Sequence, residues 1–138
     1  MASKPLALIT GAAHRLGKAF ATALAQEGYA IALHYWKSQE EAQRTAGELL
    51  AIGVPVFSLR ADLTDADAIP RLFDQLDRLA HPLGVLVNSA GVFRGSDPRH
   101  TGAAEWDLTM DLNLRAPFLC AQQAAARMTS GGLIIHGK

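Results

Sequence analysis

Short apolar runs alternate with stretches of helical period along the chain. The apolar runs have the length of strands and lie at residues 6–10, 30–35, 55–59, 85–88 and 133–136. The helical stretches between them lie at residues 15–27, 38–53, 67–80, 103–110 and 113–128. Alternation of this kind predicts βαβ units, and therefore an α/β fold whose parallel sheet is joined by crossover helices.

Residues at the ends of the helical stretches support these bounds. Gly28 and Gly53 stand where a left-handed residue would end the first and second helices. Ser38–Glu41 has the spacing of a capping box, which predicts the start of the second helix. Asp67 is the expected N-cap of the third helix, and Pro117 is expected to kink the long helix near its start.

The composition narrows the class of protein. We expect one domain over residues 1–138, because the chain is long enough for a real core and is 49% hydrophobic. Thirteen basic residues balance thirteen acidic ones, so nothing predicts a nucleic-acid partner. No apolar segment approaches the roughly 20 residues that span a bilayer. Cys120 is the only cysteine, which argues against a metal centre and favours the cytoplasm.

The first strand breaks into a turn that contains glycine, and a helix follows at once. Gly11 would let the backbone turn tightly and approach a phosphate, and Gly17 would let the helix pack near the strand. The helix N-terminus then offers free N–H groups to a dinucleotide pyrophosphate. An ordinary strand-to-helix turn is the alternative for this motif taken alone.

Four motifs in order resemble those of the short-chain dehydrogenase/reductase family. They are Thr10-Gly11 with Gly17, Asp62-Leu63, Asn88-Ser89-Ala90-Gly91, and Asn113 in the long helix. Arg15-Leu16-Gly17 and the His34-Tyr35-Trp36-Lys37-Ser38 stretch look like the pteridine reductase branch. The resemblance implies a Rossmann-type three-layer α/β/α sandwich with parallel strand order 3-2-1-4-5, truncated after the fifth strand.

The resemblance also implies which residues bind the cofactor. They are Gly11, His14, Arg15, Leu16, Gly17, His34, Trp36, Lys37, Ser38, Asp62, Leu63, Asn88, Ser89, Ala90 and Gly91. The second strand ends without a carboxylate, and Lys37 and Ser38 follow it, so NADP(H) is the expected dinucleotide. Alternatives remain: a solvated Arg15, Ser38 as an N-cap, and Asp62 as a turn residue.

Part of the family's chemistry is absent from the sequence. Asn113 is the one catalytic residue that the resemblance retains; a structural hydrogen bond to backbone is its other possible role. The family's Ser and Tyr-x-x-x-Lys are missing, because Tyr29 and Tyr35 are the only tyrosines. We therefore expect the cofactor-binding half of an NADP(H)-dependent reductase, inactive by itself. A complete non-catalytic nucleotide-binding or scaffold module is the alternative.

Self-association is the last expectation from the sequence. The fifth strand would leave an apolar edge, and edges of that kind pair with other chains. The helix at 113–128 would expose a face that includes Phe118, Leu119 and Gln122. A homodimer through this helix or through the fifth strand is the simplest closed assembly.

Overall fold

Five parallel strands form one sheet in the computed structural model, which describes residues 4–93, 95 and 97–137. The strands are β1 (Leu6–Ile9), β2 (Ala30–Tyr35), β3 (Val56–Arg60), β4 (Leu83–Asn88) and β5 (Leu133–His136). Their order is β3-β2-β1-β4-β5, which confirms the predicted order. The sheet grows in opposite directions on either side of β1, so a crevice is expected at the carboxyl ends of β1 and β4.

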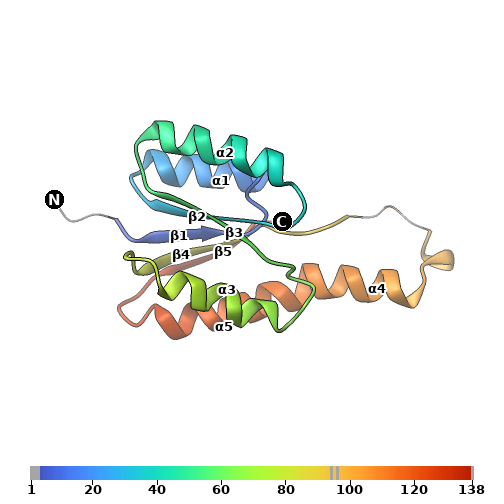
Figure 1. Ribbon diagram of the computed structural model, residues 1–138. Helices are drawn as coiled ribbons and strands as arrows, with labels where there is room; N and C mark the ends of the chain where they lie inside the picture. Colours follow the sequence, from blue (N-terminus) through green and yellow to red (C-terminus); the bar gives the residue numbers. More distant parts are fainter. Residues whose placement is uncertain (1–3, 94, 96, 138) are drawn as a thin grey trace.

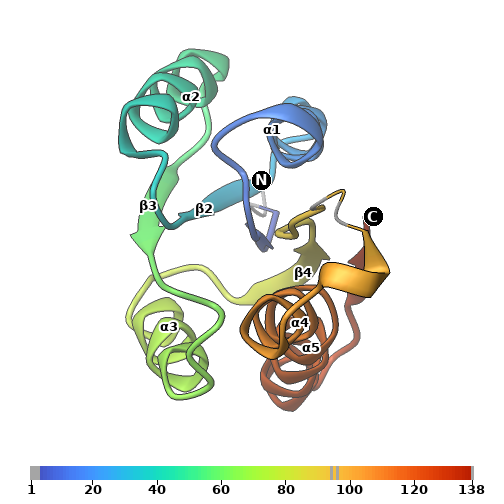
Figure 2. The ribbon, with the colours of Figure 1, turned by 90° about the vertical axis from the view of Figure 1, so that its right-hand side faces the viewer.

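Helices cover both faces of the sheet and complete three layers (Figures 1 and 2). One face carries α1 (Arg15–Gln26) and α2 (Gln39–Ile52), and the other carries α3 (Ala68–Asp77) and α5 (Ala116–Arg127). The remaining helix, α4 (Ala103–Met110), extends past the end of the sheet in Figure 1. No helix among the described residues is long and apolar enough to cross a membrane.

The core lies on both faces of β1, and every side chain of this strand is fully buried. Leu6 and Leu8 belong to the cluster that contains Phe73 of α3. Ala7 and Ile9 belong to the cluster on the α1 and α2 side. Because successive side chains of a strand point to opposite faces, a strand buried on both sides is continuously apolar.

The predicted start of the long helix at Asn113 is wrong, because α5 begins at Ala116. The chain runs from α4 through a π-helical turn (Asp111–Arg115) directly into α5, where Pro117 is the second residue. The Ala116 N–H bonds to the Asp111 carbonyl, five residues back. Pro117 has no N–H to bond to the Asn113 carbonyl, so the looser turn replaces a regular one.

The predicted capping box at Ser38 is also wrong in its chemistry. Ser38 occupies the N-cap of α2, but its side chain makes no capping hydrogen bond. Gly28 and Gly53 do have left-handed backbones, with φ of +93° and +106°, at the ends of α1 and α2. Asp67 is the N-cap residue of α3, as expected, again without a side-chain cap. The positions were thus predictable, and the side-chain bonds were not.

Candidate cofactor-binding site

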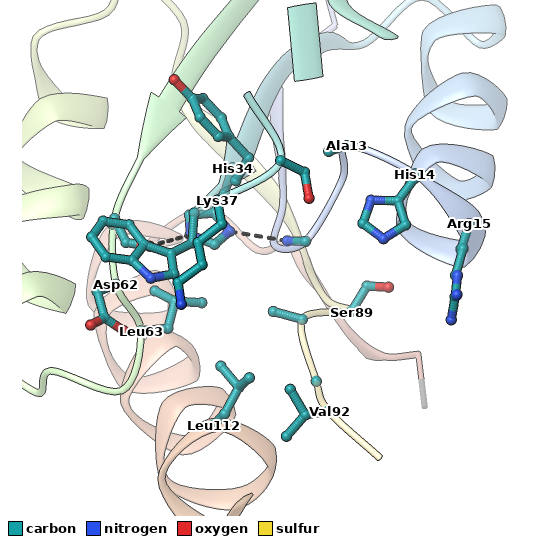
Figure 3. Close-up of a pocket in the computed structure, with 18 of the residues that line it drawn as sticks. Ala13, His14, Arg15, His34, Lys37, Asp62, Leu63, Ser89, Val92 and Leu112 are labelled. Atoms are coloured by element: carbon teal, nitrogen blue, oxygen red, sulfur yellow. Dashed lines mark hydrogen bonds between the residues drawn. The ribbon is translucent and has the colours of Figure 1, made fainter. Parts of the chain in front are cut away.

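A pocket of about 430 Å³ opens at the carboxyl ends of β1, β2, β3 and β4 (Figure 3). Most of the residues selected from the sequence line it: Gly11, His14, Arg15, Leu16, Gly17, His34, Trp36, Lys37, Ser38, Asp62, Leu63, Ser89, Ala90 and Gly91. Sequence analysis did not select the other lining residues, which are Ala13, Tyr35, Ala61, Thr64, Val92 and Leu112. Motifs far apart in the chain therefore meet at one crevice.

Two glycines allow the turn after β1 to pack closely. Gly11 has a left-handed backbone with φ of +62°, and a Cβ there would lie 2.8 Å from Ala90 Cα. A Cβ on Gly17 would lie 2.1 Å from the Gly11 carbonyl oxygen. The turn thus approaches the loop after β4, and α1 starts against the turn, as the glycine spacing predicts.

The side chain of Thr10 ties the first turn to the loop after β4. Its hydroxyl oxygen accepts hydrogen bonds from the N–H groups of Ser89 and Ala90, each at 3.0 Å. Thr10 itself is 1% exposed, so the hydroxyl that accepts these bonds belongs to a buried residue. The small residues of the Asn-Ser-Ala-Gly motif let this backbone reach the Thr10 hydroxyl.

Both ring nitrogens of His34 bond to backbone groups of neighbouring strand ends. Nδ1 accepts a hydrogen bond from the Gly11 N–H at 3.0 Å, and Nε2 donates to the Ala61 carbonyl at 2.8 Å. Burial lowers the pKa of His34 to about 4, although the hydrogen bond to Ala61 opposes that shift. The ring is therefore neutral at physiological pH.

Basic side chains outnumber carboxylates in the lining of the pocket. Arg15 and Lys37 line it and are exposed, whereas Asp62 is the one carboxylate among the described lining residues. Arg15 stands at a left-handed position, with φ of +54°, a backbone conformation that residues other than glycine rarely adopt. The Arg60 guanidinium lies 4.3 Å from the centroid of the Trp36 ring, and its Nε donates to the Trp36 carbonyl.

Asp62 lines the pocket and also closes a turn. Its Oδ1 accepts hydrogen bonds from the N–H of Thr64 at 3.0 Å and from the Thr64 hydroxyl at 2.6 Å. The turn role considered from the sequence is therefore present in the structure. Arg115 reaches the same loop, because its Nη2 donates to the Thr64 carbonyl.

The two selected asparagines do not line the pocket. Asn88 is buried behind it; its Nδ2 donates to the Pro117 carbonyl and lies 3.4 Å from His136 Nδ1. Asn113 accepts from the Val92 N–H at 2.9 Å and donates to the Val92 carbonyl at 2.6 Å. Asn113 therefore makes the structural hydrogen bonds to backbone that the sequence left open.

Sequence reasoning missed residues that hold the lining in place. Thr45 is buried on α2, and its hydroxyl donates to the Ala13 carbonyl at 2.6 Å. Arg60 carries no sequence signal either, since its contact with Trp36 arises from the β2–β3 register, where Tyr35 pairs with Arg60. The sequence contained one usable signal for these residues, which is a polar residue at a helix position that faces the core. That signal applies only to Thr45.

Comparison with known proteins places the chain in a family. The model of the family described as short chain dehydrogenase matches residues 5–136. The chain therefore belongs to the short-chain dehydrogenase family. Among curated relatives, 3-oxoacyl-[acyl-carrier-protein] reductase FabG of Staphylococcus aureus is 37% identical over 131 residues, covering 93% of this chain and 53% of that protein.

Solved structures of similar proteins agree with the fold. A dehydrogenase/reductase from Sinorhizobium meliloti is 35% identical with a TM-score of 0.91, covering 98% of this chain and 54% of that one. A short-chain dehydrogenase from Burkholderia cenocepacia, in complex with NADP, is 33% identical with a TM-score of 0.92. The similarity covers 97% of this chain and 54% of the Burkholderia chain. The chain thus spans about half the length of these relatives.

Proposed function

We propose that the chain is the NADP(H)-binding part of a short-chain dehydrogenase/reductase. The charge arrangement at the crevice carries the proposal, because Arg15 and Lys37 line the pocket and the end of β2 provides no carboxylate. In dinucleotide folds, an acidic side chain at that strand end binds the ribose 2′-hydroxyl, whereas a basic one accommodates the 2′-phosphate. The NADP complex of the Burkholderia relative supports the same cofactor.

Calorimetric titration with NADPH and with NADH tests this proposal. NADPH should bind more tightly, and Lys37→Glu should weaken NADPH binding by about 1–3 kcal/mol, the value of a charged hydrogen bond. Arg71→Glu makes the same change of charge at an exposed position of α3, outside the pocket, and should leave the affinity unchanged. Equal affinities for NADPH and NADH would contradict the proposal.

The reaction proposed for the whole protein is hydride transfer to a carbonyl or a pterin-like substrate. Arg15-Leu16-Gly17 and the His34–Ser38 stretch support the pteridine reductase-like branch. The name of the Staphylococcus relative supports a carbonyl substrate instead. An activity assay that compares a dihydropterin with a 3-oxoacyl thioester, on protein that includes a Tyr-x-x-x-Lys segment, separates the two substrate classes.

The 138-residue chain by itself is proposed to lack reductase activity. Its only tyrosines are Tyr29 and Tyr35, and the Asn113 side chain bonds to the backbone of Val92. Turnover by the mass-verified chain, clearly above that of a variant with Gly11 and Arg15 both replaced, would contradict this.

The alternative is a complete, non-catalytic nucleotide-binding or scaffold module. A native reading frame that ends at Lys138 would favour that alternative, and one that continues into Tyr-x-x-x-Lys would favour the reductase.

The proposed partner is a second copy of the chain. Leu114 in the π-helical turn is 62% exposed, Phe118 on α5 is 59% exposed, and Leu133 on the edge strand β5 is 53% exposed. Leu119, expected on the same open face, instead packs against the core, because that side of α5 faces the sheet. Light scattering tests the proposal: a mass near 14.7 kDa at micromolar concentration would exclude the dimer.

A cytoplasmic location is proposed from the lone, buried Cys120.

A further inference from the structure

We propose that His34 is a positioning residue that fixes two loops of the pocket relative to each other. They are the loop after β1, on the expected phosphate side, and the loop after β3, on the expected adenine side. The proposal rests on the NADP(H)-binding function proposed above. It assigns His34 a different role from direct contact with the cofactor, because both ring nitrogens are already occupied by backbone groups. Figure 3 shows the ring between these groups, with both bonds drawn as dashed lines.

The ring of His34 joins three successive strand ends. His34 lies on β2, Gly11 belongs to the turn after β1, and Ala61 directly follows β3. The backbone of β2 also bonds to both of these loops. The Ala12 N–H donates to the His34 carbonyl at 2.9 Å. The Ala61 N–H donates to the Tyr35 carbonyl at 3.2 Å. The imidazole thus adds a rigid bridge where β-sheet pairing ends.

Only one form of the imidazole satisfies both neighbours. The Gly11 N–H requires an acceptor at Nδ1, and the Ala61 carbonyl requires a donor at Nε2, so the ring is the neutral Nε2–H tautomer. An imidazolium would turn an N–H toward the Gly11 N–H. His34 is 3% exposed. None of the described titratable side chains lining the pocket bonds to it: His14, Arg15, Tyr35, Lys37 and Asp62.

The two anchored groups belong to opposite sides of the site. Gly11 has the left-handed backbone that brings the first turn against Ala90, and its N–H direction is set by the bond to His34. Ala61 leads directly into Asp62 and Leu63, which line the pocket on the other side. A loss of the bridge would therefore let the two loops shift relative to each other, and a dinucleotide spans both.

Substitutions that replace one ring nitrogen at a time test this role. His34→Asn places an amide oxygen near the position of Nδ1, and His34→Gln places an amide nitrogen near the position of Nε2. His34→Leu removes both bonds. NADPH affinity should fall by about tenfold or more in His34→Leu. His34→Asn and His34→Gln should each recover part of that loss, which a simple packing role would not predict.

A second readout needs no cofactor and separates this proposal from the proposed function. Amide exchange at Gly11, measured by NMR, should accelerate in His34→Leu and His34→Gln but stay slow in His34→Asn. Ile69→Val, in the core cluster that packs on α3, is the control for lost stability alone and should change neither readout. Unchanged Gly11 exchange in His34→Leu overturns the positioning role, whether or not NADPH binds. Absence of NADPH binding by the unsubstituted chain overturns only the proposed function.

Discussion

The loops at the carboxyl ends of β1–β4 and the α4–β5 side of the molecule are built in opposite ways. Around the loops, buried polar side chains bond to loop backbone across a large sequence separation, as Thr10, His34 and Thr45 do. On the α4–β5 side, α4 buries no residue, and Trp106 is 59% exposed. Hydrogen bonds of the short segment before α4 are local, such as those between Asp97 and Arg99.

The difference indicates what each region requires. Buried polar groups are costly unless they are paired, so the loops have one arrangement that satisfies them all. The α4–β5 side presents the apolar side chains of Trp106, Phe118 and Leu133 to water, which is typical of a surface that another chain covers. The first region is therefore shaped by the chain itself, and the second is proposed to be completed by a partner. Substitutions in either region test that distinction.

The largest effect is expected at Gly17, where a methyl group has no space. Gly17→Ala would place a Cβ 2.1 Å from a backbone oxygen, so it should lower the free energy of unfolding by about 4 kcal/mol. Gly47→Ala is the control, because Gly47 is inside α2 with nothing within 4 Å of the added Cβ. It should raise stability by about 1 kcal/mol. Denaturant unfolding measures both, and a Gly17→Ala protein as stable as the parent would contradict close packing at the turn.

A pH dependence of similar size is expected from His34. Its pKa is about 4 in the folded chain against an ordinary value of 6.5, so only the unfolded chain takes up this proton between those values. Stability is therefore fully present above pH 6.5 and falls as the pH drops to 4, by about 3 kcal/mol. The difference between the parent and His34→Asn, measured by unfolding across this range, isolates the histidine from the carboxylates. A difference that does not vary with pH would refute a buried neutral ring.

At Arg15 we expect a smaller change in stability together with a change in NADPH affinity. Arg15→Gly relieves a left-handed backbone and should raise the free energy of unfolding by about 1 kcal/mol. The same change removes a cation from the pocket and should weaken NADPH binding by about tenfold. Arg15→Lys keeps the charge and the strain, so it should leave stability near that of the parent. Calorimetry and thermal unfolding together check the pair, and a gain in NADPH affinity for Arg15→Gly would contradict it.

The smallest effect on stability is expected on the exposed side. Phe118→Ala should change the free energy of unfolding of the monomer by less than about 0.5 kcal/mol, because Phe118 is 59% exposed. Phe73→Ala is the matched control, since Phe73 is fully buried and its truncation should cost about 3–5 kcal/mol. Light scattering should meanwhile show weaker self-association for Phe118→Ala. A large loss of monomer stability would mean that the Phe118 side chain itself packs inside the monomer.

Much of the fold was predictable because burial on both faces leaves a strong pattern. The apolar runs of β1 and β4 are continuous since neither face meets water, and the crossover helices follow the ordinary helical period. The start of α5 was not predictable in the same way. The π turn at Asp111–Arg115 depends on the missing N–H of Pro117 and on how α4 continues into α5. The spacing of hydrophobic residues along the chain does not reveal a π-helical turn.

The candidate site was predictable in its location and less so in its bonds. Gly11 and Gly17 have a steric requirement that no other residue meets, so their spacing along the chain is enough to indicate the turn. Ser38 could equally have capped a helix or faced a pocket, and its local sequence is the same in both cases. Side chains that bond across the fold, such as Asn88 with the Pro117 carbonyl, have no local signature.

The amino-acid sequence by itself determined the succession of strands and helices and the turn at which a dinucleotide would lie. These depend on period, glycine freedom and helix ends, which are properties of neighbouring residues. Only the tertiary structure decided that His34 bridges Gly11 and Ala61, and that Asn113 bonds to Val92. The physical reason is that a hydrogen bond needs two groups at about 3 Å with suitable directions. Sheet pairing and helix packing set that distance for residues far apart in the chain.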